Sequence, residues 1–134
     1  MSAQYVCFDE NDNFATFTNA GGFPPFLIDS KTGSAKEISG AGPFLGALKR
    51  PRFNEQPFKV EPGQALILYT DGLLESFNCG DRKEGFDRFR NLAIKAFDVD
   101  PEIYCSKILD GCRSLNGSQF NDDRTVVVML RTDN

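Results

Sequence analysis

Carboxylates stand at two places in this sequence where an acidic side chain can hold a metal ion. Asp71 follows the uninterrupted apolar run 65–69 after one intervening residue. Asp122 and Asp123 come just before a second apolar run, 125–130, which is rich in β-branched residues. Short apolar runs bounded by turn residues are typical of buried strands. A carboxylate at the open end of such a strand can meet solvent and an ion without being desolvated.

If these two strands are antiparallel neighbours, their acids lie at one edge of the sheet, because one strand ends where the other begins. Oxygen ligands of this kind favour Mg²⁺ or Mn²⁺ over Zn²⁺. Water bound by such ions can have its pKa lowered from about 15.7 toward 7. The sequence contains no histidine, which excludes histidine-assisted nucleophilic catalysis and histidine-ligated zinc. The chemistry therefore has to use carboxylates, hydroxyls, backbone groups or a metal.

The same acids also have ordinary structural interpretations. Asp-Gly after a strand, here Asp71 and Gly72, is a common turn sequence. Gly72 supplies either a turn conformation, which is the favoured interpretation, or close packing at the site. Two acids before a strand often form a solvated turn or a cap. From the residues alone, the metal site and the turns remain open alternatives.

The elements that must position these acids form an α+β pattern with mostly antiparallel strands. Two helices are predicted between the last two buried strands, the second capped by Asp100 and begun by Pro101. A glycine- and proline-rich loop is predicted over 39–57. The predicted strands are 5–8, 14–18, 26–28, 58–60, 65–69 and 125–130, and the predicted helices are 82–97 and 101–115.

Length and composition predict one globular domain over residues 1–134, since the chain is 40% hydrophobic and 25% charged. The net charge of −4, and the lack of a Lys/Arg cluster dense enough to neutralise several phosphates, argue against a binder of nucleic-acid phosphates. No apolar stretch approaches the roughly 20 residues that span a bilayer, and no signal peptide is evident. We therefore expect a cytoplasmic protein without membrane insertion. No C-x-x-C pair occurs, so neither a zinc knuckle nor a redox motif is predicted. The four cysteines could pair, but without an export signal we expect free buried thiols instead.

Four segments in order, 18–27, 42–46, 61–75 and 122–128, resemble the C-terminal half of a SpoIIE/RsbU-type serine phosphatase domain. These bacterial enzymes are a branch of the metal-dependent 2C-type protein phosphatases. The resemblance implies an α-β-β-α sandwich with a two-metal centre of Mn²⁺ or Mg²⁺ between its sheets. It also implies hydrolysis of a phosphoserine or phosphothreonine ester by a metal-activated water. The usual substrate in that family is a phosphorylated anti-anti-sigma factor, which implies a role in bacterial signalling and sigma factor regulation.

The resemblance also assigns roles by position. Asp71 and Asp122 would be metal ligands. Asp123 would hold a coordinated water or support a ligand. Thr125 would orient a neighbouring acid by hydrogen bonding, or it is an ordinary strand residue. Glu75 would make a structural contact rather than bind metal.

Two departures from the family pattern matter. Gly22 stands where relatives usually have histidine. The chain also lacks the earlier Asp, followed by a Gly-His-Gly-like turn, whose carboxylate bridges the two metals in the family. We therefore expect a fragment of a longer phosphatase, inactive or weakly active by itself, with weak metal affinity.

Such a fragment would expose sheet edges that favour self-association, so a homodimer is one expectation. The alternative is a non-catalytic phosphatase-like module that binds a phosphoprotein or another regulatory partner. Phe23 and Phe44, which lie in predicted loops, either belong to the core or form part of a partner-binding surface.

Overall fold

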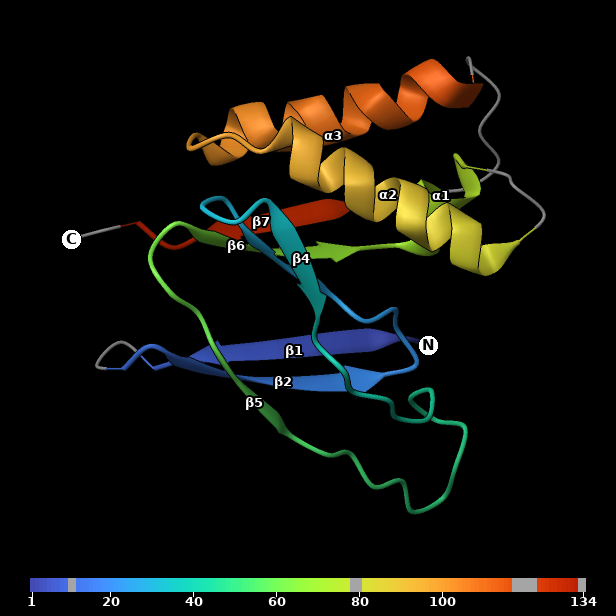
Figure 1. Cartoon of the computed structure of the whole chain (residues 1–134). Coiled ribbons are helices and arrows are strands. Elements are labelled where there is room, and N and C mark those ends of the chain that lie inside the picture. The colour runs from blue at the N-terminus through green and yellow to red at the C-terminus, as the bar shows by residue number, and fades with distance from the viewer. Residues whose placement is uncertain (10–11, 78–80, 117–122, 133–134) are drawn as a thin grey trace.

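Two antiparallel sheets lie face to face, and helices cover the outer face of one of them (Figure 1). The computed structural model describes residues 1–9, 12–77, 81–116 and 123–132. One sheet has the order β1-β2-β5 and the other the order β4-β3-β6-β7. The strands are β1 Ala3–Phe8, β2 Phe14–Ala20, β3 Phe26–Asp29, β4 Ser34–Glu37, β5 Gln56–Lys59, β6 Gln64–Tyr69 and β7 Val126–Leu130; the helices are α1 Asp71–Glu75, α2 Arg82–Ala96 and α3 Pro101–Asn116.

The predicted α+β class is confirmed, and both predicted helices are present as α2 and α3. The predicted cap of α3 is also confirmed, because Asp100 Oδ1 accepts hydrogen bonds from the N–H groups of Glu102 (2.9 Å) and Ile103 (3.2 Å). Two elements differ from the expectation. A short helix, α1, begins where a turn was predicted after β6, so three helices separate β6 from β7. Strand β4 was not predicted, because it is a mostly exposed edge strand with little apolar signal.

Strand β6 occupies the centre of the fold, and its side chains alternate between two cores. Leu66 belongs to the core between the sheets, together with Phe17 and Phe58. Ile67 and Tyr69 belong to the core between the larger sheet and the helices. A strand buried on both faces has to be apolar at every position. This explains why the run 65–69 shows no alternation, and it makes β6 a rigid mount for the residues that follow it.

Strands β6 and β7 pair antiparallel, which is the condition under which the sequence placed the acids at one edge, with Tyr69 opposite Val126 at the end of the ladder. Continuing the same register one residue beyond the strands places Thr70 opposite Thr125. This pairing therefore places the segment that contains Asp71 and the segment that contains Asp123 at the same edge of the sheet.

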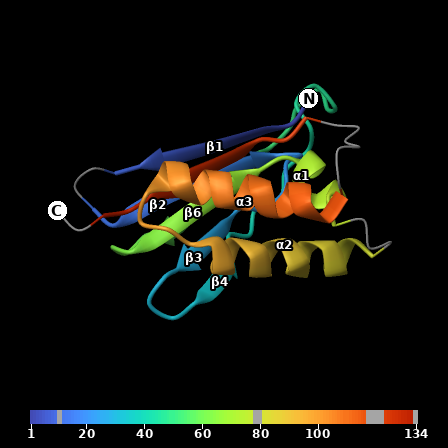
Figure 2. The same ribbon diagram turned by 90° about the horizontal axis from the view of Figure 1, so that it is seen from above.

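The outer face of the β1-β2-β5 sheet carries no helix within the described residues, as Figures 1 and 2 show. Tyr5 and Phe14 are 66% and 48% exposed on its strands. A complete α-β-β-α sandwich would place a second helical layer over this face. The described residues therefore make up one helical layer and two sheets of that architecture.

Cys7, Cys105 and Cys112 are free, as predicted, but only Cys112 of these three is buried, and Cys79 lies outside the described residues. Burial raises the pKa of the Cys112 thiol to about 11, so this group stays protonated at neutral pH. Across the described ranges, no helix has both the length and the apolar character needed to cross a membrane.

Candidate functional site

Thr70 links the two segments of the chain that carry the acids. Its N–H donates to the carbonyl oxygen of Thr125 (3.1 Å), which extends the ladder past the strand ends. Its hydroxyl Oγ1 donates to the carbonyl oxygen of Asp123 (3.2 Å) and accepts from the N–H of Thr125 (3.0 Å). Three hydrogen bonds therefore fix the backbone of 123–125 beside the residue that precedes Asp71.

Asp71 is exposed and is the first residue of α1. Its Oδ1 accepts a hydrogen bond from the N–H of Gly72 (3.1 Å), so the carboxylate is held by its own backbone. Leu73 is fully buried in the core beneath the helices and anchors the other side of α1. Asp71 is thus an accessible carboxylate on a rigid support, which is the property the sequence predicted for it.

Gly72 is helical and buried rather than part of a turn. Positive φ angles in the described part of the chain belong to Gly21, Gly33, Gly46 and Gly63. The Asp-Gly pair therefore begins a helix, and the preference for a turn at Gly72 was wrong. Packing, the alternative for this glycine, agrees with its burial.

The structure describes only some of the other predicted site residues. Asp122 lies outside the described residues. Asp123 is exposed, and its carbonyl oxygen is bound by Thr70. Thr125 contributes through its backbone N–H and carbonyl groups rather than through a described bond of its hydroxyl. Thr70 was not singled out from the sequence, although its position between the end of a buried strand and an acid could have drawn attention to it.

Glu75 is exposed and its charge acts on the pKa of Arg124, and the structural contact expected of Glu75 stays a prediction. Burial lowers the pKa of the Arg124 guanidinium, the nearby Cys112 thiol raises it, Arg113 lowers it and Glu75 raises it. Arg124 is partly buried and follows Asp123 directly, so its backbone lies within the segment that Thr70 holds.

The acids in the described residues do not complete a metal site by themselves. No group of three Asp, Glu or Cys side chains that could hold an ion occurs among them. Asp71 provides a hard oxygen ligand, the type that Mg²⁺ and Mn²⁺ prefer. Asp71 therefore fits as one ligand of such a site. Asp122 and at least one further carboxylate would be required to complete it.

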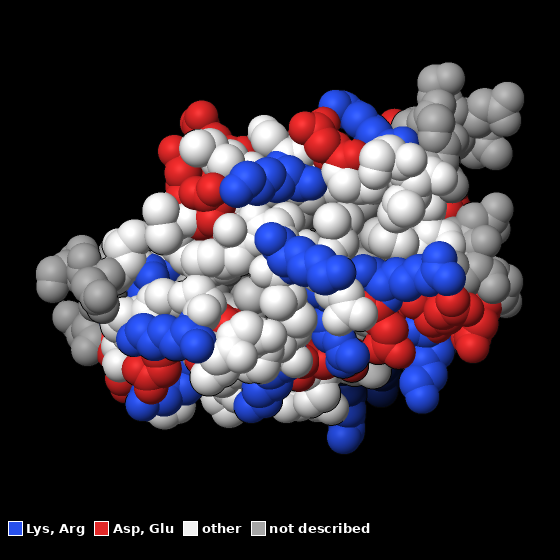
Figure 3. Space-filling model, turned by 45° about the horizontal axis from the view of Figure 1, so that its top comes forward, with Lys and Arg blue, Asp and Glu red and all other residues white. Residues whose placement is uncertain are grey.

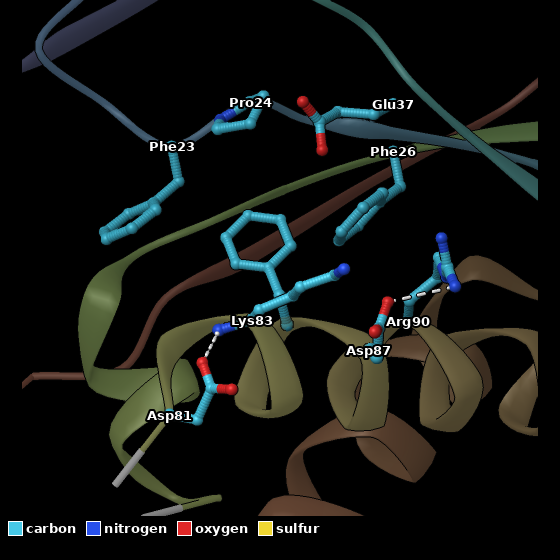
Figure 4. A pocket seen from close by; sticks show the side chains of 9 residues that line it. Phe23, Pro24, Phe26, Glu37, Asp81, Lys83, Asp87 and Arg90 are labelled. Carbon is cyan, nitrogen blue, oxygen red and sulfur yellow. Dashed lines mark hydrogen bonds and ion pairs between the residues drawn. The ribbon is translucent and has the colours of Figure 1, made fainter. Parts of the chain in front are cut away.

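A groove of about 670 Å³ opens between the β2–β3 connection and α2 (Figure 4), and its lining does not include Asp71 or Asp123. Figure 4 shows Phe23, Pro24, Phe26 and Glu37 on one side and the charged residues of α2 on the other. The lining residues are Phe23, Pro24, Phe26, Glu37, Asp81, Lys83, Phe86, Asp87 and Arg90.

The wall of this groove is tied to the end of β6. The ring of Phe23 stacks with that of Tyr69 at a centroid distance of 6.2 Å, and the Phe86 ring lies 6.0 Å from Tyr69. The Tyr69 hydroxyl donates to the carbonyl oxygen of Pro24 (2.9 Å). Tyr69 precedes Asp71 by two residues, so the groove and the carboxylate share one support.

The segment that contains the histidine-to-glycine departure is held by Asn19, which is only 4% exposed. The Asn19 side chain donates to the carbonyl oxygens of Gly22 (2.8 Å) and Gly40 (2.9 Å) and accepts from the Gly22 N–H (2.8 Å). A Cβ at Gly22 would lie 2.9 Å from Cγ of Gln4. A histidine here would therefore require Gln4 to move. The chain turns sharply after β2 at Gly21, which has a positive φ of 72°.

We expect the Thr70 hydroxyl to affect the geometry of the site more than the stability of the fold, because Thr70 is exposed and its hydroxyl links the two acidic segments. We predict that Thr70→Val lowers metal-dependent activity about 10- to 100-fold, the usual cost of losing a group that supports a metal ligand. Thr70→Ser keeps the hydroxyl and should retain most of that activity. Urea unfolding of both variants checks that the fold is intact. Equal activity of Thr70→Val and wild type would contradict this role.

Comparison with known proteins agrees with these features. The sequence profile of the family Stage II sporulation protein E (SpoIIE) matches residues 1–132. Protein IcfG of Synechocystis sp. (strain ATCC 27184 / PCC 6803 / Kazusa) is 26% identical over 123 residues, which are 92% of this chain and 19% of IcfG.

Solved structures show the same fold. The phosphatase domain of the cell fate determinant SpoIIE from Bacillus subtilis (Mn presoaked) matches with a TM-score of 0.76 at 18% identity, covering all of this chain and 57% of that one. The structure of the RsbU and RsbW domains of Rv1364c from Mycobacterium tuberculosis matches with a TM-score of 0.81 at 27% identity, covering 98% of this chain and 36% of that one. This chain thus spans at most three-fifths of these relatives. Its match over residues 1–132 confirms the resemblance drawn from the motifs, and the chain belongs to the SpoIIE family.

Proposed function

We propose that this chain forms part of a metal-dependent protein serine/threonine phosphatase that hydrolyses a phosphoserine or phosphothreonine ester. One observation carries the proposal: in a chain of the SpoIIE family, the three hydrogen bonds of Thr70 hold the 123–125 segment beside Asp71. Two acidic segments more than fifty residues apart in sequence thereby meet at an accessible edge.

In this proposal Asp71 and Asp122 hold Mn²⁺ or Mg²⁺, and Asp123 supports them. When bound, the metal ions supply a water whose pKa is lowered toward about 7. Thr70 keeps the segments that carry these ligands in register. A further carboxylate would come from a segment equivalent to the part of the relatives that this chain does not match.

The groove beside Tyr69 would receive the polypeptide that flanks the phosphorylated residue. Its aromatic wall suits apolar side chains, and its rim carries both signs of charge, including the ion pair of Arg90 with Asp87 (3.0 Å). The partner we propose is a phosphorylated protein of the anti-anti-sigma type, in a cytoplasmic signalling pathway. A homodimer through the uncovered face of the β1-β2-β5 sheet is part of the same proposal.

A second candidate is a non-catalytic module that binds a phosphoprotein. It is favoured by one observation, the absence of a three-ligand cluster among the described residues. The two candidates differ in whether the phosphate is released.

The test is hydrolysis of p-nitrophenyl phosphate and of a phosphoserine peptide by the phosphatase that contains this chain, before and after EDTA treatment. We expect both substrates to be hydrolysed, both activities to be lost with EDTA, and Mn²⁺ or Mg²⁺ to restore them. Peptide binding without any hydrolysis would support the non-catalytic module instead. Hydrolysis that resists EDTA would contradict the metal-dependent mechanism.

A further inference from the structure

The loop between β4 and β5 is strongly basic in an acidic protein. We define the basic loop as residues 43–55, which contain Lys49, Arg50 and Arg52 against the single acid Glu55. Its net charge is therefore +2, from three cations and one anion, whereas the whole chain has −4. All three cations are exposed. Like-charged residues crowded on one loop repel each other, so they add nothing to the stability of the free chain.

The three cations of the loop take no part in the ion pairs among the residues that the structure describes. Within the described residues they form no ion pair, whereas Arg88, Arg90, Arg113, Lys59 and Lys107 each pair with a carboxylate. On the helical face in Figure 3, blue and red side chains lie intermixed. The loop thus presents uncompensated positive charge, which is available to a partner.

The base of the basic loop is fixed to the end of β2. The Gly21 N–H donates to the carbonyl oxygen of Gly42 (3.0 Å), and the Phe44 ring packs so closely on Gly21 that a Cβ there would lie 2.4 Å from Cδ1 of Phe44. Gly42 in turn lies against the backbone of Asn19, where a Cβ would be 2.1 Å from the Asn19 carbonyl oxygen. A surface with a fixed base loses less conformational entropy on binding than a free loop does.

The loop also lies at the same end of the sandwich as Asp71. Its base is bound to the β2–β3 connection, and the same connection is bound to Tyr69 through Pro24. Figure 1 shows the loop and α1 at one end of the two sheets, with the loop beyond the three-stranded sheet. A protein bound across this end could contact the loop while one of its side chains reaches Asp71.

The composition of the loop indicates the kind of partner. Phe44 and Leu48 are 55% and 56% exposed next to the cations. Aromatic residues and arginine are enriched at protein interfaces. Three cations on an otherwise acidic protein are too few for nucleic acid, where affinity grows with the number of phosphates neutralised. The fitting partner is a protein surface with acidic and apolar residues.

We infer that the basic loop docks an acidic segment of the phosphorylated protein substrate, on the side of the site opposite to α2. This inference rests on the proposed phosphatase function, whose substrate it describes further. The loop binds the body of the substrate and takes no part in the chemistry. It should therefore act on KM for substrates with acidic flanks and leave kcat unchanged.

The test compares the triple variant Lys49→Ala/Arg50→Ala/Arg52→Ala with a matched control, Lys31→Ala/Lys36→Ala/Lys95→Ala. The control removes three exposed cations that also lack ion pairs in the described residues and lie outside the loop. The probes are two phosphoserine peptides with about ten residues on each side, a length that extends to about 33 Å per side. One peptide has Asp and Glu flanks and the other has Asn and Gln flanks.

The triple variant should raise KM for the acidic peptide about 8-fold, from roughly twofold for each exposed ion pair lost. Its kcat, its KM for the neutral peptide and its hydrolysis of p-nitrophenyl phosphate should not change. Added salt should reduce the difference, because exposed charges are screened. An equal rise for both peptides, or an equal effect of the control variant, would overturn the inference.

Two further measurements separate the possible failures. Fluorescence anisotropy of the labelled acidic peptide tests docking even if wild type hydrolyses nothing, so failure of the phosphatase proposal does not hide failure of the loop. If the acidic peptide binds more weakly to the triple variant but not to the control variant, docking on the basic loop is supported. Sedimentation of both proteins tests the competing occupant, a second copy of this chain. A loss of dimer in the triple variant with unchanged peptide binding would overturn the inference.

Discussion

Replacing Asp71 by Asn should lower the turnover of the phosphatase that contains this chain by more than about 100-fold. Removal of a group that only supports a metal ligand costs roughly 10- to 100-fold, and Asp71 is proposed to bind the metal directly. An amide keeps the size of the side chain and can still accept the hydrogen bond from the Gly72 N–H. It loses the negative charge that attracts a divalent cation. The measurement is kcat with p-nitrophenyl phosphate at saturating Mn²⁺.

Glu75→Gln is the matched control for Asp71→Asn, because both acids are exposed and both lie in α1. It removes the same charge from the same short helix, and we expect it to retain most activity. Both variants should unfold at urea concentrations close to wild type, since surface substitutions usually change stability by no more than about 0.5 kcal/mol. Retained turnover in both Asp71→Asn and Asp122→Asn would contradict the assignment of the ligands.

The largest effect on stability is expected for Phe89→Ala. Phe89 lies on α2, is fully buried, and has its ring 4.7 Å from that of Tyr69 and 6.0 Å from that of Phe77. Deleting a buried phenylalanine ring removes its hydrophobic burial and leaves a cavity, at a cost of about 3–5 kcal/mol. That is a large part of the roughly 5–15 kcal/mol that stabilises a typical domain. The free energy of unfolding in urea measures it.

Phe14→Ala is the control for ring deletion, because Phe14 is 48% exposed on β2. Its cost should be well below that of Phe89→Ala. Because Tyr69 loses its neighbour in Phe89→Ala, hydrolysis should also weaken at temperatures where the variant is still folded. If the two variants lower the free energy of unfolding equally, the packing of Phe89 between α2 and β6 is not a major source of stability.

The sequence was most informative where apolar patterning is continuous. The runs 65–69 and 125–130 predicted two strands, of which β6 is buried as expected and β7 is a partly exposed edge strand. The sequence placed the acids at one edge only on the condition that these strands pair antiparallel, and the structure meets that condition. The helices α2 and α3 were predicted because each is long enough to show helical periodicity and carries a cap. Long-range order of the motifs, rather than any single motif, indicated the family.

Other features depend on contacts that sequence patterns do not record. Helix α1 has five residues, too few to display a period, so Asp-Gly suggested a turn. In the sequence, Thr70 looks like an ordinary residue at the end of a strand. Its role in linking the acidic segments depends on the 123–125 segment lying opposite to it. The groove forms because Pro24 meets Tyr69 across 45 residues of sequence. These contacts arise from tertiary packing, which overrides local preference.

Calorimetric titration of Mn²⁺ into this chain tests most directly the central claim that Asp71 is one ligand of an incomplete metal site. We predict weak binding to wild type, loss of that binding in Asp71→Asn, and no change in Glu75→Gln. Weak affinity is expected because only two of the proposed ligands, Asp71 and Asp122, come from this sequence. Equal Mn²⁺ binding by wild type and Asp71→Asn, or tight binding of two ions by this chain alone, would contradict the account.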